Sequence, residues 1–203
     1  MIRRRLTGSP RFATPLVAIV VVALVVAGCA GAVASFDPTG SCVADGVAVG
    51  AYPELEALVP ATFEDQAPET LDSGRNCTSE NLGSLASAGI DEVRFAGGTW
   101  SFGGRRAAAL VVFQAPGLRA ADVAEFYRAS AAIANRTEVT AATEMILADR
   151  KGFRLDTTTG DRVQTVLIWP ASVADRVNVV LSTDLPDPKL LAAVDAIEAV
   201  ADR

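Results

Sequence analysis

The chain has 203 residues, half of them hydrophobic, and it contains no histidine. The lack of histidine excludes catalytic triads with a histidine base and removes the commonest metal ligand. Residues 1–28 hold four Arg and no acid, so the remainder has 14 basic and 24 acidic residues and a net charge of −10. This acidity disfavours nucleic acid and anionic lipid headgroups as partners, and fits basic peptides, cationic ligands or plain solubility.

The chain begins with a basic stretch, Arg3, Arg4 and Arg5, which an apolar segment over residues 16–27 follows. Basic residues in this position keep the N-terminus on the cytoplasmic side. The apolar segment has the length of a signal-peptide core and falls short of the about 20 residues that a membrane-spanning helix needs. An uncleaved anchor helix or an ordinary cleaved signal are alternatives, and each places the rest of the chain outside the cytoplasm.

Val26, Ala27, Gly28 and Cys29 end this segment and resemble the lipobox of bacterial lipoproteins: an aliphatic residue, two small residues and a cysteine. By that resemblance residues 1–28 are a signal peptide, and Cys29 receives a diacylglycerol thioether and becomes the new N-terminus. Further acyl chains such as palmitate would hold the protein stably, because one chain alone binds a bilayer only marginally. The resemblance implies a lipid-anchored protein on the extracytoplasmic face of the cell membrane.

Residues 29–41 are small and polar, and we expect the lipidated cysteine and a short tether that reaches at most about 40 Å. One extracytoplasmic domain is expected over residues 42–203. Its two cysteines, Cys42 and Cys77, favour a structural disulfide in an oxidising compartment. A metal site and a redox pair are the alternatives, but the first lacks further ligands and the second lacks Cys-x-x-Cys spacing.

In the first half of this domain, helix signals precede strand signals. Pro53 begins a short helix that Pro60 ends, and Thr78 caps a second helix that reaches Ala88. Residues 61–76 between them are expected to be loop or one weak strand. Apolar alternation then predicts strands and a Gly-Gly hairpin turn, with the strands over residues 93–95, 100–102 and 107–113.

In the second half, apolar residues at helical spacing predict an amphipathic helix over residues 119–135. A turn is expected over residues 159–161, and Pro170 ends a strong strand. Asp187 is expected to cap the last helix, with Pro188 at its first position. The strands expected in this half cover residues 137–147, 153–155, 163–169 and 177–181.

Short turns between strands favour antiparallel pairing, and amphipathic helices must cover a face of the sheet. We therefore expect an α+β fold: a single antiparallel β-sheet with amphipathic helices packed on one face. The organisation resembles a loose group of uncharacterised lipoproteins from high-GC bacteria, in which a Leu-Glu-x-Leu-x-Pro-like helix opens the domain, as in residues 55–60. That resemblance implies a fold style and no particular chemistry.

Catalytic motifs are missing from the sequence. Neither Lys151 nor Lys189, the only lysines, stands in a Ser-x-x-Lys motif, and the glycine-rich residues 97–104 lack the Gly-Lys-Ser/Thr of a phosphate loop. Glycoside chemistry would need two acids facing one cleft within about 5 to 10 Å. The candidate acids lie near predicted turns and are Glu144, Asp149, Asp156 and Asp161. We expect no catalytic residue, metal or cofactor.

Four aromatic residues are candidates for a ligand pocket between the sheet and the helices: Trp100, Phe102, Phe126 and Trp169. The favoured function is a membrane-anchored, non-catalytic binding domain at the cell envelope. Its expected partners are the lipid bilayer, through acylated Cys29, and an envelope protein or small ligand. The alternatives are a carrier or sensor of a small apolar ligand, which requires a cavity lined by these aromatic residues, and a carboxylate-dependent envelope hydrolase.

Overall fold

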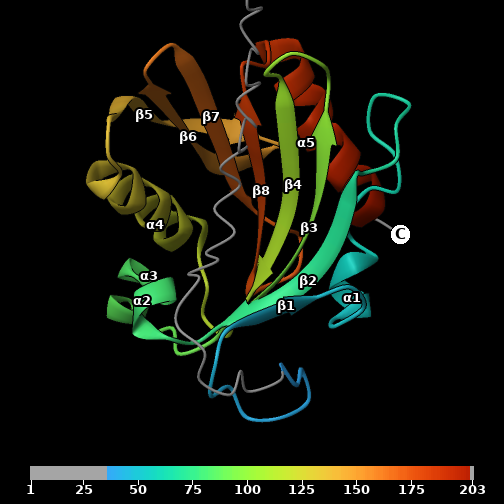
Figure 1. Ribbon diagram of the computed structural model, residues 1–203, viewed down its shortest axis with the longest axis vertical. Helices are drawn as coiled ribbons and strands as arrows, with labels where there is room; N and C mark the ends of the chain where they lie inside the picture. Colours follow the sequence, from blue (N-terminus) through green and yellow to red (C-terminus); the bar gives the residue numbers. More distant parts are fainter. Residues whose placement is uncertain (1–35, 202–203) are drawn as a thin grey trace, which may run out of the picture.

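The computed structural model describes residues 36–201, so the expected signal peptide and Cys29 lie outside the described residues. Within this range one sheet has eight strands in the order β1-β2-β3-β4-β8-β7-β6-β5, and all its neighbouring strands are antiparallel (Figure 1). The strands are β1 (Gly46–Ala48), β2 (Thr70–Asn76), β3 (Val93–Ser101), β4 (Ala107–Gln114), β5 (Thr137–Leu147), β6 (Arg150–Thr159), β7 (Arg162–Pro170) and β8 (Arg176–Thr183).

Five helices occur among residues 36–201, and three of them are single turns. They are α1 (Pro53–Glu56), α2 (Ser79–Leu82), α3 (Ser84–Ser87), α4 (Ala120–Ile133) and α5 (Asp187–Ala201). None of these described helices combines the length and the apolar character that crossing a membrane requires.

The sheet is assembled mainly from neighbours in sequence. The chain from β2 to β4 and the chain from β5 to β8 each form antiparallel ladders, and the pairing of β4 with β8 joins the two blocks. The turn between β3 and β4 contains Gly103 and Gly104, with φ of 77° and 62°. This backbone conformation suits glycine, because a Cβ atom is disfavoured at positive φ. The prediction of an antiparallel sheet with short turns is confirmed.

Helices cover both faces of the sheet, so the prediction of helices on one face is wrong. Strand β7 shows this best. Its Leu167 and Trp169 belong to the core cluster that contains α5, whereas Val166 and Ile168 belong to the cluster that contains α4. In Figure 1, α2, α3 and α4 lie on one side of the sheet and α1 and α5 on the other. The uninterrupted apolar run in β7 is typical of a strand buried on both faces.

Several predicted elements differ in detail from the structure. The helix expected over residues 53–59 is the single turn α1, and the helix expected over residues 78–88 divides at Gly83, whose φ is 52°, into α2 and α3. The two short strands expected within residues 93–102 are one strand, β3. Asp187 is the first residue of α5 rather than its cap, and its carboxylate accepts a hydrogen bond from Arg154 at 2.9 Å.

Two strands at one edge of the sheet, β1 and β2, also differ from the prediction. The weak strand allowed within residues 61–76 is β2, which has seven residues, and the three-residue β1 beside it was not expected. Strand β5, the expected strand over residues 137–147, is present over that whole range. Strand β1 was not predicted because three residues are too few to show an alternation of apolar and polar side chains.

Candidate functional site at the N-terminal segment

Residues 36–50, which we call the N-terminal segment, are bound to the edge of the sheet through Arg75 of β2. This side chain is only 3% exposed. Its guanidinium donates hydrogen bonds to the carbonyl oxygens of Gly40 at 2.7 Å, Asp37 at 2.9 Å and Ser41 at 3.1 Å. One planar fork of donors therefore holds three backbone carbonyls, a geometry that the single ammonium of lysine does not reproduce.

Aromatic packing holds the same segment. The guanidinium carbon of Arg75 lies 5.7 Å from the centre of the Phe36 ring, and the rings of Phe36 and Tyr52 meet edge to face at 6.5 Å. Gly46 permits this close approach, since a Cβ atom there would stand 2.3 Å from the Phe36 ring. The described part of the expected tether, residues 36–41, is thus packed against the domain and does not hang free.

The predicted disulfide is confirmed and also fixes the N-terminal segment. Cys42 and Cys77 are bonded with a sulfur–sulfur distance of 2.05 Å and a Cα–Cα distance of 6.0 Å. Cys77 directly follows β2, and the two cysteines are 35 positions apart in sequence. The bond therefore ties the N-terminal segment covalently to the strand that already holds it through Arg75.

Asp45 makes a third attachment. Its carboxylate accepts hydrogen bonds from the backbone N–H of Cys77 at 2.6 Å and of Thr78 at 3.0 Å, from the Thr78 hydroxyl, and from the Asn81 amide at 2.6 Å. Burial acts to raise the pKa of Asp45, but the hydrogen bonds from Thr78, Cys77 and Asn81 outweigh it and hold the pKa below its ordinary value. The charged carboxylate thus joins the N-terminal segment to the start of α2.

Sequence reasoning missed both Arg75 and Asp45. Their partners lie more than 30 residues away in the chain, and contacts at that separation leave no local pattern. The available signal was that Arg75 stands two residues before Cys77, which was already expected to bond to Cys42. Cys29, the residue expected to be acylated, lies outside the described residues.

The four aromatic residues proposed for a pocket do not surround one space. Trp100 and Trp169 are 1% and 0% exposed and lie in the core between the sheet and α5, with Phe102 packed against that core. Phe126 packs into the cluster on the opposite face of the sheet. The structure therefore places these residues in two separate hydrophobic cores.

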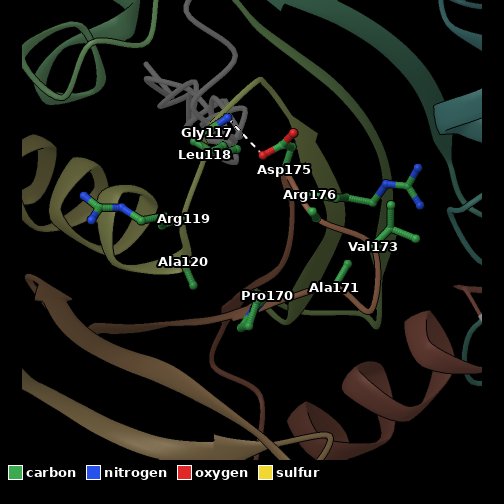
Figure 2. A pocket seen from close by; sticks show the side chains of 10 residues that line it. Gly117, Leu118, Arg119, Ala120, Pro170, Ala171, Val173, Asp175 and Arg176 are labelled. Atoms are coloured by element: carbon green, nitrogen blue, oxygen red, sulfur yellow. Dashed lines mark hydrogen bonds between the residues drawn. The ribbon is translucent and has the colours of Figure 1, made fainter.

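Two cavities in the described part of the chain lie elsewhere. One, of about 470 Å³, is open to solvent between the start of α4 and the loop that joins β7 to β8. Figure 2 shows the Arg119 and Arg176 side chains extending to opposite sides of it, and Asp175 accepting a hydrogen bond from the Gly117 N–H at 3.0 Å. The other, of about 310 Å³, lies between residues 57–62 and the end of α5 and has a mostly apolar lining. Neither cavity is lined by two carboxylates or by the candidate aromatic residues.

The acids considered for hydrolysis are dispersed and line neither cavity. Asp156 pairs with Arg154 at 2.8 Å and accepts a hydrogen bond from Thr165 at 2.6 Å. Three further acids lie in turns or at the sheet edge: Asp161, which pairs with Arg105 at 2.6 Å, Glu144, which faces Lys151 at 3.5 Å, and Asp149 in the turn between β5 and β6. Among the described residues, no group of three or more Cys, Asp or Glu is arranged to hold a metal ion.

The comparisons with known proteins assign no family, and they include a distant structural likeness. No protein-family model matches the chain, and no curated protein matches it. Among solved structures, the chain is similar to the extracellular domain of PknH from Mycobacterium tuberculosis, with 10% sequence identity over 60% of this chain and 70% of that chain, and a TM-score of 0.26. A likeness at this level assigns neither a family nor a function.

Proposed function

We propose that this protein is a lipoprotein, anchored through acylated Cys29 to the extracytoplasmic face of the cell membrane, whose domain acts as a non-catalytic binding module. The anchor rests on the lipobox-like residues 26–29, and the structural observation that supports a short tether is the attachment of residues 36–41 to the sheet by Arg75. Six residues, 30–35, separate Cys29 from that bound segment. At about 3.4 Å per residue, Cys29 and Phe36 lie at most about 24 Å apart.

This distance distinguishes a domain held at the membrane from one carried on a stalk. A tether that ran free to residue 41 would reach at most about 40 Å. Because the disulfide, Arg75 and Asp45 all act on the N-terminal segment, any pull from the anchor is transmitted to β2 and α2. The disulfide also suits export, since such bonds persist in oxidising compartments outside the cytoplasm.

The non-catalytic role rests mainly on the sequence. The chain lacks histidine, the commonest general base, and its two lysines form ion pairs with Glu144 and Glu64. A net charge of −10 beyond residue 28 favours a cationic partner, such as a basic segment of an envelope protein or a cationic small ligand.

Acylation is tested on protein expressed in a bacterium with an intact lipoprotein pathway. Mass spectrometry of the membrane fraction is expected to show a mature chain that begins at Cys29 and carries a diacylglyceryl thioether. The Cys29→Ser protein is expected to lack the added mass and to leave the membrane fraction. The matched control, Cys42→Ser/Cys77→Ser, removes the other thiols and is expected to retain the acyl chains.

Two results would count against the proposal. A free thiol at Cys29 in the mature protein, or a mature N-terminus at another residue, would overturn the anchor. Turnover of an envelope substrate that persists in the Cys29→Ser protein, and is lost on substitution of one acidic residue, would overturn the non-catalytic role.

A further inference from the structure

Exposed large apolar side chains gather in residues 43–50 of the N-terminal segment, which we call the apolar strip. Val43 and Val49 are 82% and 81% exposed, and Val47 between them is 49% exposed. These three are among eight large hydrophobic residues exposed within the described chain, although the strip is only eight residues long. Single exposed apolar residues are ordinary, but such a concentration marks an interaction surface.

The outer surface of the strip carries no free charge. Asp45 is the one charged residue between positions 43 and 50, and its carboxylate is directed to Cys77, Thr78 and Asn81. The run at residues 47–50 consists of Val, Ala, Val and Gly, all exposed. The strip thus exposes small and β-branched apolar residues on an otherwise acidic domain.

The strip is held in place and cannot fold its valines inward. Its middle forms β1, in which Val47 is paired with Gly74 of β2. One end follows the bonded Cys42, and at the other end the Gly50 N–H donates a hydrogen bond to Glu56 at 2.7 Å. An apolar surface fixed in this way stays exposed unless something outside the described chain covers it.

The strip lies close to Phe36, from which the chain leads back to Cys29. Phe36, the first described residue, packs against Gly46 in the middle of the strip. Cys29 stands seven residues before Phe36, so it lies at most about 24 Å from that contact. In Figure 1 the blue segment that leads into β1 lies at one end of the molecule, and β5 lies toward the opposite end.

We propose that the apolar strip rests on the lipid bilayer that holds acylated Cys29, so that the β1 edge of the sheet faces the membrane. This inference rests on the proposed acylation. The short distance from Cys29 gives the strip a high effective concentration at the bilayer. A weak contact is then enough to hold the strip on the membrane surface. Apolar side chains lie favourably at the boundary between headgroups and acyl chains. The bilayer surface that fits is zwitterionic, because the domain is acidic.

The test uses the full lipidated protein in phosphatidylcholine vesicles with brominated acyl chains, which quench tryptophan emission on contact. Val43→Trp and Val49→Trp place an indole on the strip, and Ile133→Trp, at a position 86% exposed at the end of α4, is the matched control. The native Trp100 and Trp169 are buried and provide a constant background.

We expect the added emission at positions 43 and 49 to fall about twofold or more, and that at position 133 to be unchanged. Equal quenching at all three positions would overturn the inference. The absence of quenching at positions 43 and 49, in protein whose Cys29 carries its acyl chains, would also overturn it. Neither result would contradict the proposed anchor. A mature protein without acyl chains would overturn both.

A second measurement needs no substitution in the strip. Hydrogen exchange of residues 43–50 is expected to be slower in the vesicle-bound protein than in the Cys29→Ser protein free in solution, whereas exchange of β5 is expected to be the same in both. Equal exchange of residues 43–50 in the two proteins would contradict the contact.

Discussion

The indole nitrogen of Trp169 donates a hydrogen bond of 2.7 Å to the carboxylate of Glu198, which ties the C-terminal end of β7 to α5. The same carboxylate accepts hydrogen bonds from Asn178 at 3.0 Å and from Arg150 at 2.7 Å. Three strands, β6, β7 and β8, therefore meet one acidic side chain of a helix. Trp169, a candidate for a ligand pocket, acts in the structure as a buried anchor with its N–H satisfied.

Substitution of Glu198 by Ala is expected to lower the free energy of unfolding by about 3 kcal/mol. The buried donors of Trp169 and Asn178 and the partly exposed guanidinium of Arg150 all lose their acceptor. Urea denaturation followed by tryptophan fluorescence measures the change. The control is Glu125→Ala, which removes an exposed partner of Arg128 and is expected to have no measurable effect. Equal loss in the two variants would contradict a special role for Glu198.

Replacement of Arg75 by Lys is expected to loosen residues 36–41, because an ammonium does not hold the carbonyls of Asp37, Gly40 and Ser41 together. Hydrogen exchange in residues 36–41 is expected to accelerate about tenfold, which corresponds to about 1.4 kcal/mol of lost local stability. Arg128→Lys, at the surface of α4, is the control. Unchanged exchange in the Arg75→Lys protein would show that the aromatic contacts and the disulfide suffice.

Removal of the disulfide by Cys42→Ser/Cys77→Ser is expected to lower the free energy of unfolding by about 4 kcal/mol, because the bond closes a long loop in the unfolded chain. Thermal unfolding under non-reducing conditions measures the loss, and the wild-type protein in reductant is expected to show the same loss. A decrease below about 1 kcal/mol would mean that the unfolded chain stays compact without the bond.

The contribution of Asp45 to stability is expected to depend on pH. Its folded pKa lies below the ordinary value of 3.8, so the stabilisation is full above that value and is lost as the pH falls through the folded pKa. The difference in unfolding free energy between the wild-type protein and Asp45→Asn should therefore be constant above about pH 4 and shrink in more acidic solution. Asp91→Asn, which removes an exposed carboxylate, is the control. A constant difference down to pH 2 would contradict the lowered pKa.

Long elements with strong local patterns were predictable from the sequence. Strand β5 lies where β-rich composition placed it, and β7 and β8 lie where runs of apolar residues placed them, within a few residues. Helix α4 lies where helical spacing placed it. The short elements were not, because α1, α2 and α3 are single turns whose ends depend on packing and on Gly83. A single turn gains little from its own hydrogen bonds, so the surrounding structure decides its length.

The coverage of both sheet faces was encoded in β7 but was not deduced. Its residues 166–169 are apolar without interruption, and an uninterrupted strand of this kind is buried on both sides. The aromatic candidates failed as one set for a related reason. Strand alternation places Trp169 on one face of the sheet, and the position of α4 places Phe126 on the other face. The four aromatic residues therefore do not line one pocket.

The sequence by itself determined the antiparallel strands, the pairing of Cys42 with Cys77 and the lipobox-like residues that end at Cys29. These features depend on local alternation, on the small number of cysteines and on a contiguous motif. Only the tertiary structure decided that Arg75 and Asp45 bind the N-terminal segment to the sheet and that the apolar strip within this segment stays exposed. Those contacts join residues more than 30 positions apart, and chain folding alone brings such residues within hydrogen-bonding distance.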